Sequence, residues 1–285
     1  MDPASIVKLI LVIGIVGIVI SIGARSRPED TLALVRNPAL GARAMLSMFV
    51  AVPLFVLFIT WAVDLDRPVR TALLALAVSP MPPIITKKEE KVGGDADYGI
   101  GLQVLGTIFS IIAVPFMLMI AGAVFGVSGS FDPFAMSKLL IITVAAPLAI
   151  GMALGRYFAA HRNAIAHWAG LIGTIALLVG AVPLLLATWQ SMWALVGGGV
   201  LLVIMAIIGF ALLVGHLLGG PDEGNRGALA VASAARHPGV AIALSVGIFP
   251  NFSAEITGAV LLFLLANVVL TLPYVKWRHR VVARA

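Results

Sequence analysis

The chain has 285 residues, of which 61% are hydrophobic and only 11% are charged. With a mean hydropathy of +1.09, this composition excludes a soluble globular domain, in which roughly a quarter of residues are charged. The formal net charge of +6 does not indicate a nucleic-acid partner, because the basic residues gather in loops, where membrane topology places them.

Nine apolar segments follow one another along the chain, each close to the ~20 residues that a helix needs to cross a bilayer. Long uninterrupted runs such as residues 201–214 are incompatible with a membrane β-barrel, whose strands alternate apolar and polar residues. The sequence therefore predicts an all-α polytopic membrane protein with nine transmembrane helices. We expect the first segment to be a span and not a cleavable signal peptide. The expected spans are residues 6–23, 44–63, 69–86, 98–125, 137–155, 166–187, 193–218, 227–249 and 256–275.

The loops on one side of the expected membrane carry most of the basic residues. With the N-terminus outside, the inner loops and the C-terminal tail hold 14 of the 19 Lys and Arg residues, the outer loops hold 4, and Arg236 lies within a span. This bias predicts an outer N-terminus and a cytoplasmic C-terminus. The compact loops and short tails favour a bacterial inner membrane.

Glycines recur along the first segment and form a run at residues 197–199. We expect them to permit close helix packing and not to bind phosphate, since no strand precedes them. Those of the first segment are Gly14, Gly17 and Gly23.

The third segment is interrupted in its middle by three prolines. Proline has no backbone N–H and cannot continue a helix without a kink or a break, so residues 69–92 are expected to form a discontinuous helix. A backbone broken at mid-membrane depth survives only where it faces protein, water or a ligand. The break is thus a candidate binding site, and a kink that serves packing alone is the alternative. The interrupting prolines are Pro80, Pro82 and Pro83.

Thr86 and Lys87 stand three and four residues after the last of these prolines and are candidate substrate ligands. Lys87 offers a cation to an anionic substrate if it stands at the break. The alternative is that it belongs to a solvated cytoplasmic charge run, residues 87–91, whose charged side chains are neighbours at i,i+3 and i,i+4.

The eighth segment is interrupted as well, and residues 224–249 are expected to form a second discontinuous helix. Arg236 lies ten residues into the expected span at residues 227–249. At the centre of a span an arginine costs about 2.5 to 3.5 kcal/mol on insertion scales and usually faces a cavity. Its guanidinium can hold a carboxylate, sulfonate or phosphate through two N–H groups. The alternatives are an ion pair with Glu89 or Glu90 and a position near the interface, where the side chain snorkels. The interrupting residues are Pro238 and Gly239.

His237 is the histidine expected nearest to mid-depth in the membrane. Its imidazole changes charge close to physiological pH, which makes it a candidate proton carrier. A hydrogen-bonded structural role is the alternative.

Interruptions at corresponding places in two halves of a chain are typical of secondary transporters. The polar connection at residues 127–136 separates a first membrane repeat, residues 1–126 with four spans, from a second, residues 137–285 with five. Each interrupted span is the second to last of its half. The sequence therefore predicts a five-plus-five inverted repeat that is shortened by one helix.

Four short motifs follow in a fixed order: Ser79-Pro80 at the first break, then residues 110–115, 147–156 and 236–241. In this order they resemble the bile acid:sodium symporter superfamily, and the resemblance extends over nearly the whole chain. It implies that the two discontinuous helices cross, and that a panel domain and a core domain are interleaved across the repeats of a nine-helix member. The panel helices would be residues 6–23, 137–155 and 166–187.

The residues that hold sodium in that family are replaced in this chain. By the resemblance, Ala232 stands in place of a glutamate, Arg236 in place of a glutamine, and Thr86 in place of a small polar ligand. Gln103 and Thr107, one helical turn apart, remain as candidate polar ligands. Sodium coupling is therefore not expected, because an arginine repels a cation, and proton coupling and uniport are both open.

These observations together predict a secondary transporter that moves a small organic anion across a lipid bilayer by alternating access, with no metal site and no cofactor. A sodium-coupled bile-acid-like symporter, an anion channel and a non-transporting membrane sensor are the alternatives. An enzyme is not expected, since the acidic residues concentrate in loops. Sterol acids, keto acids and sulfonates all fit an apolar pocket lining, and the oligomeric state is left open.

Overall fold

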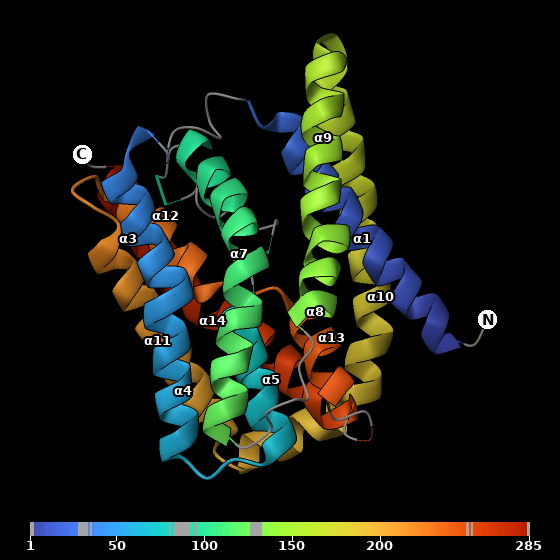
Figure 1. Cartoon of the computed structure of the whole chain (residues 1–285), viewed down its shortest axis with the longest axis vertical. Coiled ribbons are helices and arrows are strands. Elements are labelled where there is room, and N and C mark those ends of the chain that lie inside the picture. The colour runs from blue at the N-terminus through green and yellow to red at the C-terminus, as the bar shows by residue number, and fades with distance from the viewer. Residues whose placement is uncertain are drawn as a thin grey trace.

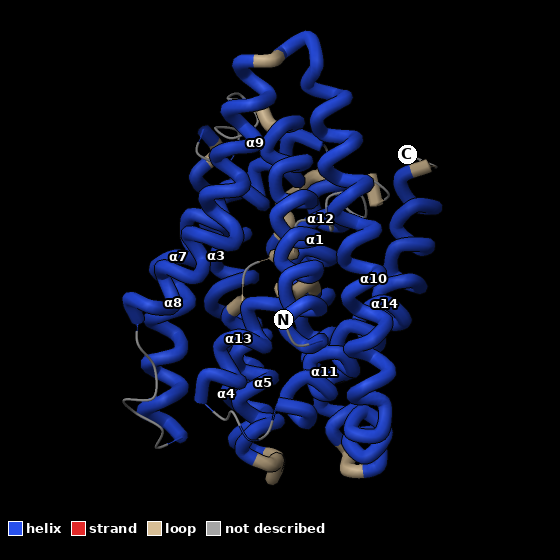
Figure 2. Tube along the Cα trace, turned by 90° about the vertical axis from the view of Figure 1, so that its right-hand side faces the viewer, coloured by secondary structure: helices blue, strands red, loops and turns tan. Residues whose placement is uncertain are grey.

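The computed structural model describes residues 3–27, 34, 36–79, 81–82, 92–93, 96–125, 133–248, 251 and 253–283. Within these ranges every regular element is a helix, as Figures 1 and 2 show, and the predicted all-α class is confirmed. In chain order the helices are α1 (Pro3–Arg25), α3 (Pro38–Leu46), the π-helical turn η1 (Ser47–Ala51), α4 (Val52–Ala62), α5 (Arg67–Val78), α7 (Ala96–Phe125), α8 (Pro133–Leu140), the π-helical turn η3 (Ile141–Ala145), α9 (Ala146–Tyr157), the short η4 (Ala159–His161), α10 (Arg162–Gly197), α11 (Val200–Leu218), α12 (Glu223–Ala234), α13 (Pro238–Ile248) and α14 (Ser253–Val282).

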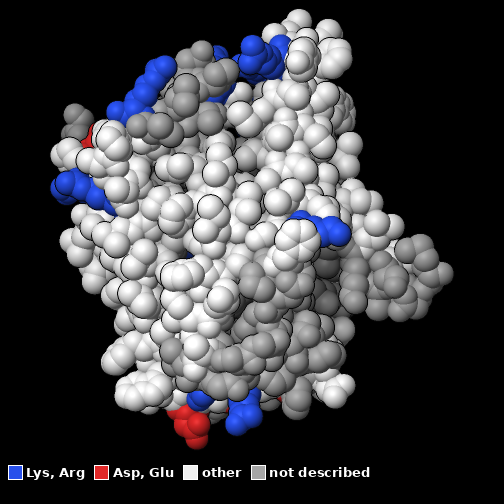
Figure 3. All heavy atoms as spheres, viewed as in Figure 1, with Lys and Arg blue, Asp and Glu red and all other residues white. Residues whose placement is uncertain are grey.

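The length and apolarity of the helices identify an integral membrane protein. Five of the described helices are long and apolar enough to cross a bilayer: Pro38–Ala62, Tyr98–Met117, Ala159–Gly197, Val200–Leu218 and Ser253–Val282. Leu9–Arg25 and Ile141–Tyr157 are shorter apolar helices. On the face drawn in Figure 3, most of the described charged side chains lie toward the two ends of the long axis, and few of them lie on the described surface between those ends. The nine-span topology, the repeats and the orientation of the termini remain predictions.

Two π-helical turns join shorter helices into continuous ones, and each immediately precedes a helix whose second residue is proline. Pro53 follows η1, and Pro147 follows η3. Proline lacks the N–H of a regular helix, and its ring clashes with the carbonyl four residues earlier. Widening the preceding turn to i→i+5 hydrogen bonds relieves this conflict.

Helices α1, α9 and α10 pack closely against one another, on the right-hand side of Figure 1. Glycines bring their backbones together: a Cβ atom added to Gly151 would lie 2.4 Å from the Ile20 carbonyl oxygen, and one on Gly23 would lie 2.3 Å from the Leu148 carbonyl oxygen. Close packing through the glycines of the first segment is thus confirmed. Close packing through the glycine run at residues 197–199 is wrong, because nothing lies within 4 Å of a Cβ atom added to Gly197 or Gly199. Gly199 instead supplies the positive φ (79°) that starts α11.

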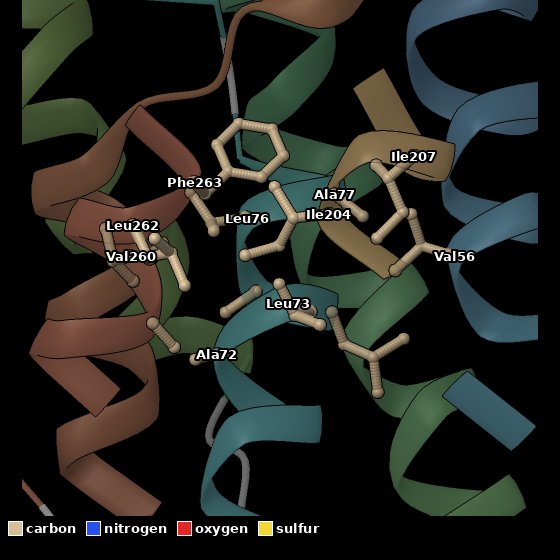
Figure 4. Close-up of a cluster of buried hydrophobic side chains, with 14 of the residues drawn as sticks. Val56, Ala72, Leu73, Leu76, Ala77, Ile204, Ile207, Val260, Leu262 and Phe263 are labelled. Carbon is tan, nitrogen blue, oxygen red and sulfur yellow. The ribbon is translucent and has the colours of Figure 1, made fainter. Parts of the chain in front are cut away.

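Helix α5 lies inside the main hydrophobic core, which Figure 4 shows in part. Side chains of α4, α11 and α14 surround it, among them Val56, Ile204 and Phe263. From Ala72 to Val78 every residue of α5 is buried, and from Gly227 to Ala234 every residue of α12 is buried. The two helices that lead into the predicted interruptions are therefore enclosed by protein, which is the condition for a broken backbone in a membrane.

Candidate functional site

The helical backbone ends at Ala234 and resumes at Pro238. Ala235 is extended (φ −86°, ψ 135°), and the next helical element begins at the proline. A residue before proline is held away from the α region, and proline suits the first position of a helix because its missing N–H would have no partner there. The Ala234 carbonyl at this end receives a hydrogen bond of 2.8 Å from the Asn267 side chain of α14.

Helix α5 ends in the same way, before a proline. Ser79 follows its last residue and is extended (φ −65°, ψ 148°). The half-buried Pro82 is also outside any helix. Pro80, Pro83, Thr86 and Lys87 lie outside the described residues, as do Glu89 and Glu90.

The two helix ends contact each other through Ser79. The backbone N–H of His237 donates to the Ser79 hydroxyl at 2.9 Å, and Nη1 of Arg236 donates to the Ser79 carbonyl at 3.4 Å. The same hydroxyl donates to the Leu76 carbonyl at 2.8 Å. All three hydrogen bonds are buried, because Ser79, Leu76, Arg236 and His237 are each at most 2% exposed.

Arg236 is almost completely buried, with 2% of its surface exposed. Nη1 also donates to the Met48 carbonyl at 3.1 Å. That carbonyl lacks its usual helical donor because the Val52 N–H bonds to Ser47 instead, and the residue after Val52 is Pro53, which has no N–H. The π-helical turn therefore presents an acceptor to Arg236.

The second terminal nitrogen of Arg236, Nη2, is buried and has no hydrogen-bond partner among the described residues. The ion pairs of those residues do not include Arg236. Its low exposure also argues against snorkelling to the interface. Part of the guanidinium is therefore unmatched within the described part of the chain, although a buried charge requires a partner.

His237 caps α13. Its Nδ1 accepts a hydrogen bond of 3.4 Å from the Val240 N–H, which requires that this nitrogen carry no proton and that a neutral ring hold its hydrogen on Nε2. A Cβ atom on Gly239 would lie 3.5 Å from Cε1 of this ring and 3.0 Å from Cδ1 of Ile15. Helix α1 thus contacts the interruption at Gly239.

Gln103 of α7 extends to the chain that follows α5. Its Nε2 donates to the Met81 carbonyl at 3.3 Å and to the Thr107 hydroxyl at 3.4 Å, and its Oε1 is buried without a partner among the described residues. The Thr107 hydroxyl donates to the Gln103 carbonyl at 2.7 Å. The structure therefore brings Arg236 and His237 to Ser79 and Gln103 to Met81, whereas Thr107 is tied to its own helix.

Several polar groups at this junction are absent from the predicted site. The hydroxyls of Ser47 and Ser233 share a hydrogen bond of 2.7 Å between η1 and α12, and both residues are fully buried. Asn267 had a signal in the sequence, since an amide within an apolar span usually bonds to another helix. The Met48 carbonyl had only an indirect one, the proline five residues later.

No group of three His, Cys, Asp or Glu side chains that could hold a metal occurs within the described ranges. Helices α5 and α12 both end close to Arg236, and the partially negative charge of a helix C-terminus favours a cation, whereas α13 begins two residues later with a partially positive end.

Comparison with protein-family models matches residues 12–215 to the sodium bile acid symporter family. The matched range covers well over half of the chain and includes α5 and Gln103, and it ends before α12. A search of curated proteins finds no significant match.

Proposed function

Because the chain belongs to the sodium bile acid symporter family, we propose that it is a secondary transporter that moves a small organic anion across the membrane by alternating access. We propose an anionic substrate because Arg236 is buried and its Nη2 has no hydrogen-bond partner among the described residues. A carboxylate or sulfonate would supply the missing acceptor through a charge-assisted hydrogen bond.

The proposed site is the junction of the two interruptions, which we take to be the crossing of two discontinuous helices. Arg236 and Gln103 each keep one buried polar atom without a partner among the described residues, Nη2 as a donor and Oε1 as an acceptor. An anionic head group that also carries a hydroxyl would satisfy both. Thr86 and Lys87, which follow the first interruption in the sequence, complete the proposed set.

The proposed motion places α1, α9 and α10 in a panel that moves against the remaining helices. Their glycine-mediated packing supports a rigid unit, and the contact of Ile15 with the Gly239 position links the movement of α1 to the site. Alternating access around a fixed site between interrupted helices follows the general pattern of secondary transporters.

We propose that sodium is not the coupling ion, since Arg236 places a positive charge at the junction that no acidic side chain neutralises within the described residues. Proton coupling through His237 and uniport are the two remaining schemes. Protonation of His237 at Nδ1 would break its bond to Val240, so a transported proton would be linked to the start of α13.

Counterflow in proteoliposomes tests the proposed function. Vesicles loaded with a sterol carboxylate, a 2-keto acid or a sulfonate should exchange at least one of them with saturable kinetics, which a channel would not show. Arg236→Gln should weaken apparent affinity roughly 10- to 150-fold, the equivalent of a charged hydrogen bond of about 1.5–3 kcal/mol. Arg226→Gln, which removes a partly exposed arginine outside the site, is the control. Exchange that is unchanged in Arg236→Gln would refute the role of Arg236, and the absence of exchange for every class would refute the substrate assignment.

A further inference from the structure

The partnered terminal nitrogen of Arg236, Nη1, is bound by two backbone carbonyls. Nη1 lies 3.1 Å from the Met48 carbonyl oxygen and 3.4 Å from the Ser79 carbonyl oxygen. These carbonyls belong to different elements, the π-helical turn η1 and the residue that ends α5. In transporters with broken helices, unwound carbonyls and the C-terminal ends of half-helices are the groups that coordinate a coupling cation.

Both helix dipoles and the extra hydroxyls fit a site for a positive charge. α5 and α12 each end next to Arg236, so two partially negative helix ends meet at this point, against the single partially positive start of α13 at Pro238. Ser47, the neighbour of Met48, and Ser233, in the last turn of α12, hold further oxygens at the same junction. Small hard cations prefer such oxygen ligands.

We infer that the Arg236 guanidinium is a tethered cation, which permanently fills a carbonyl-lined cation site between η1, α5 and α12 and holds these three elements together. One part of the inference, that a coupling cation would occupy this site, rests on the proposed transport function. It assigns two tasks to one side chain: Nη1 replaces a mobile ion, and Nη2 is left for the substrate anion.

A neutral residue at this position should vacate the site and make the protein dependent on a free cation. The carbonyls and helix ends would remain, and the Met48 carbonyl would still lack a helical donor, so a small cation could enter and stabilise the folded state by mass action. Arg236→Lys keeps the charge and should not create this dependence.

The test is the unfolding temperature of purified protein, without any organic anion, in sodium, potassium or choline chloride at equal concentration. The wild type and Arg236→Lys should unfold at the same temperature in all three salts. Arg236→Gln should unfold at a lower temperature in choline and gain about 2–4 °C in sodium or potassium. Arg278→Gln, which removes a buried arginine with a carboxylate partner, should respond equally to the three salts.

A specific stabilisation of the wild type by sodium would overturn the inference, because the site would then not be filled. A response of Arg236→Gln that is equal in all three salts would overturn it as well. If Arg236→Gln can be purified only in sodium or potassium, the inference is supported, and if it is recovered in no salt while Arg236→Lys folds, the inference is wrong. Since no anion is present, this result is independent of the counterflow experiment.

Discussion

The backbone N–H of His237 donates a 2.9 Å hydrogen bond to the hydroxyl of Ser79, a residue 158 positions earlier in the chain. Each of these two residues precedes a proline, which keeps it out of the α-helical region. Because α12 ends at Ala234, the His237 N–H has no helical acceptor, and the buried Ser79 hydroxyl just after α5 accepts its hydrogen bond. The pairing explains how the ends of α5 and α12 can share one buried location.

Ser79→Ala should destabilise the protein. The His237 N–H would lose its acceptor in a buried place, which costs about 1–3 kcal/mol. Thermal unfolding in detergent measures the effect. Ser110→Ala is the matched control, because the equally buried Ser110 hydroxyl donates only to a carbonyl of its own helix, at 2.7 Å. If both variants unfold at the same temperature, the bond between the two elements contributes nothing.

The sequence predicts the helical membrane class because span length and composition are local properties. It also predicts Arg236 and His237 as site candidates, since charge within an apolar segment is locally visible. It does not predict their partners. Arg236 donates to a carbonyl 188 positions away, and a carbonyl carries no residue-specific signal. Only the proline after the π-helical turn, which removes the usual donor, marks Met48 as an available acceptor.

Gly224→Ala should prevent tight packing between α12 and the turn at residues 92–93. A Cβ atom at Gly224 would lie 2.0 Å from the Gly93 carbonyl oxygen, a distance that no rotamer change can relieve because both groups are backbone or Cβ. We expect a loss of at least about 1–3 kcal/mol, the usual cost of overpacking. The unfolding temperature of the purified variant is the measurement.

The control for this glycine is Gly209→Ala. Gly209 lies within α11, and nothing is within 4 Å of its added Cβ atom. Alanine is favoured over glycine in a helix interior by roughly 0.5–1 kcal/mol, so this variant should be as stable as the wild type or more so. If Gly224→Ala is as stable as Gly209→Ala, the Gly93 carbonyl leaves room for a Cβ atom at residue 224, and the prediction fails.

Cysteine cross-links can separate motion within the proposed panel from motion against it, because the chain has no cysteine of its own. A Cβ atom on Gly170 of α10 would lie 3.3 Å from Cβ of Ser21 in α1, close to the separation of about 3.5–4.5 Å in a disulfide. Oxidised Ser21→Cys/Gly170→Cys should therefore transport like the wild type, since α1 and α10 move together.

The opposite result is expected for Ile15→Cys/Gly239→Cys, which joins α1 to α13. Linked by a short thiol-specific reagent, this pair should reduce transport by at least about tenfold, because it blocks the conformational step. Cleavage of the link should restore the activity. Equal transport in both linked proteins would contradict a panel that moves against the interruption.

Glu223 lies on the cytoplasmic side in the predicted topology. It should make the stability of the folded protein depend on pH. Its carboxylate lies 2.7 Å from Nη2 of the buried Arg278 and 3.0 Å from Nη1 of Arg226. The hydrogen bond from Arg278 lowers the pKa of this carboxyl below its ordinary value of 4.5. A lowered pKa in the folded state means that the stabilisation is complete above the unfolded pKa and is lost as the pH falls through the folded one.

Glu223→Gln should therefore unfold at a lower temperature than the wild type near neutral pH, and the difference should shrink once the pH falls below about 4.5, the ordinary value of the group. Asp64→Asn is the control. Asp64 is fully exposed, its carboxylate lies 4.0 Å from Nη2 of Arg70, and such surface pairs contribute little to stability. Parallel unfolding curves over a pH series measure both variants. A difference for Glu223→Gln that stays constant down to the lowest pH would show that its charge does not stabilise the contact between α12 and α14.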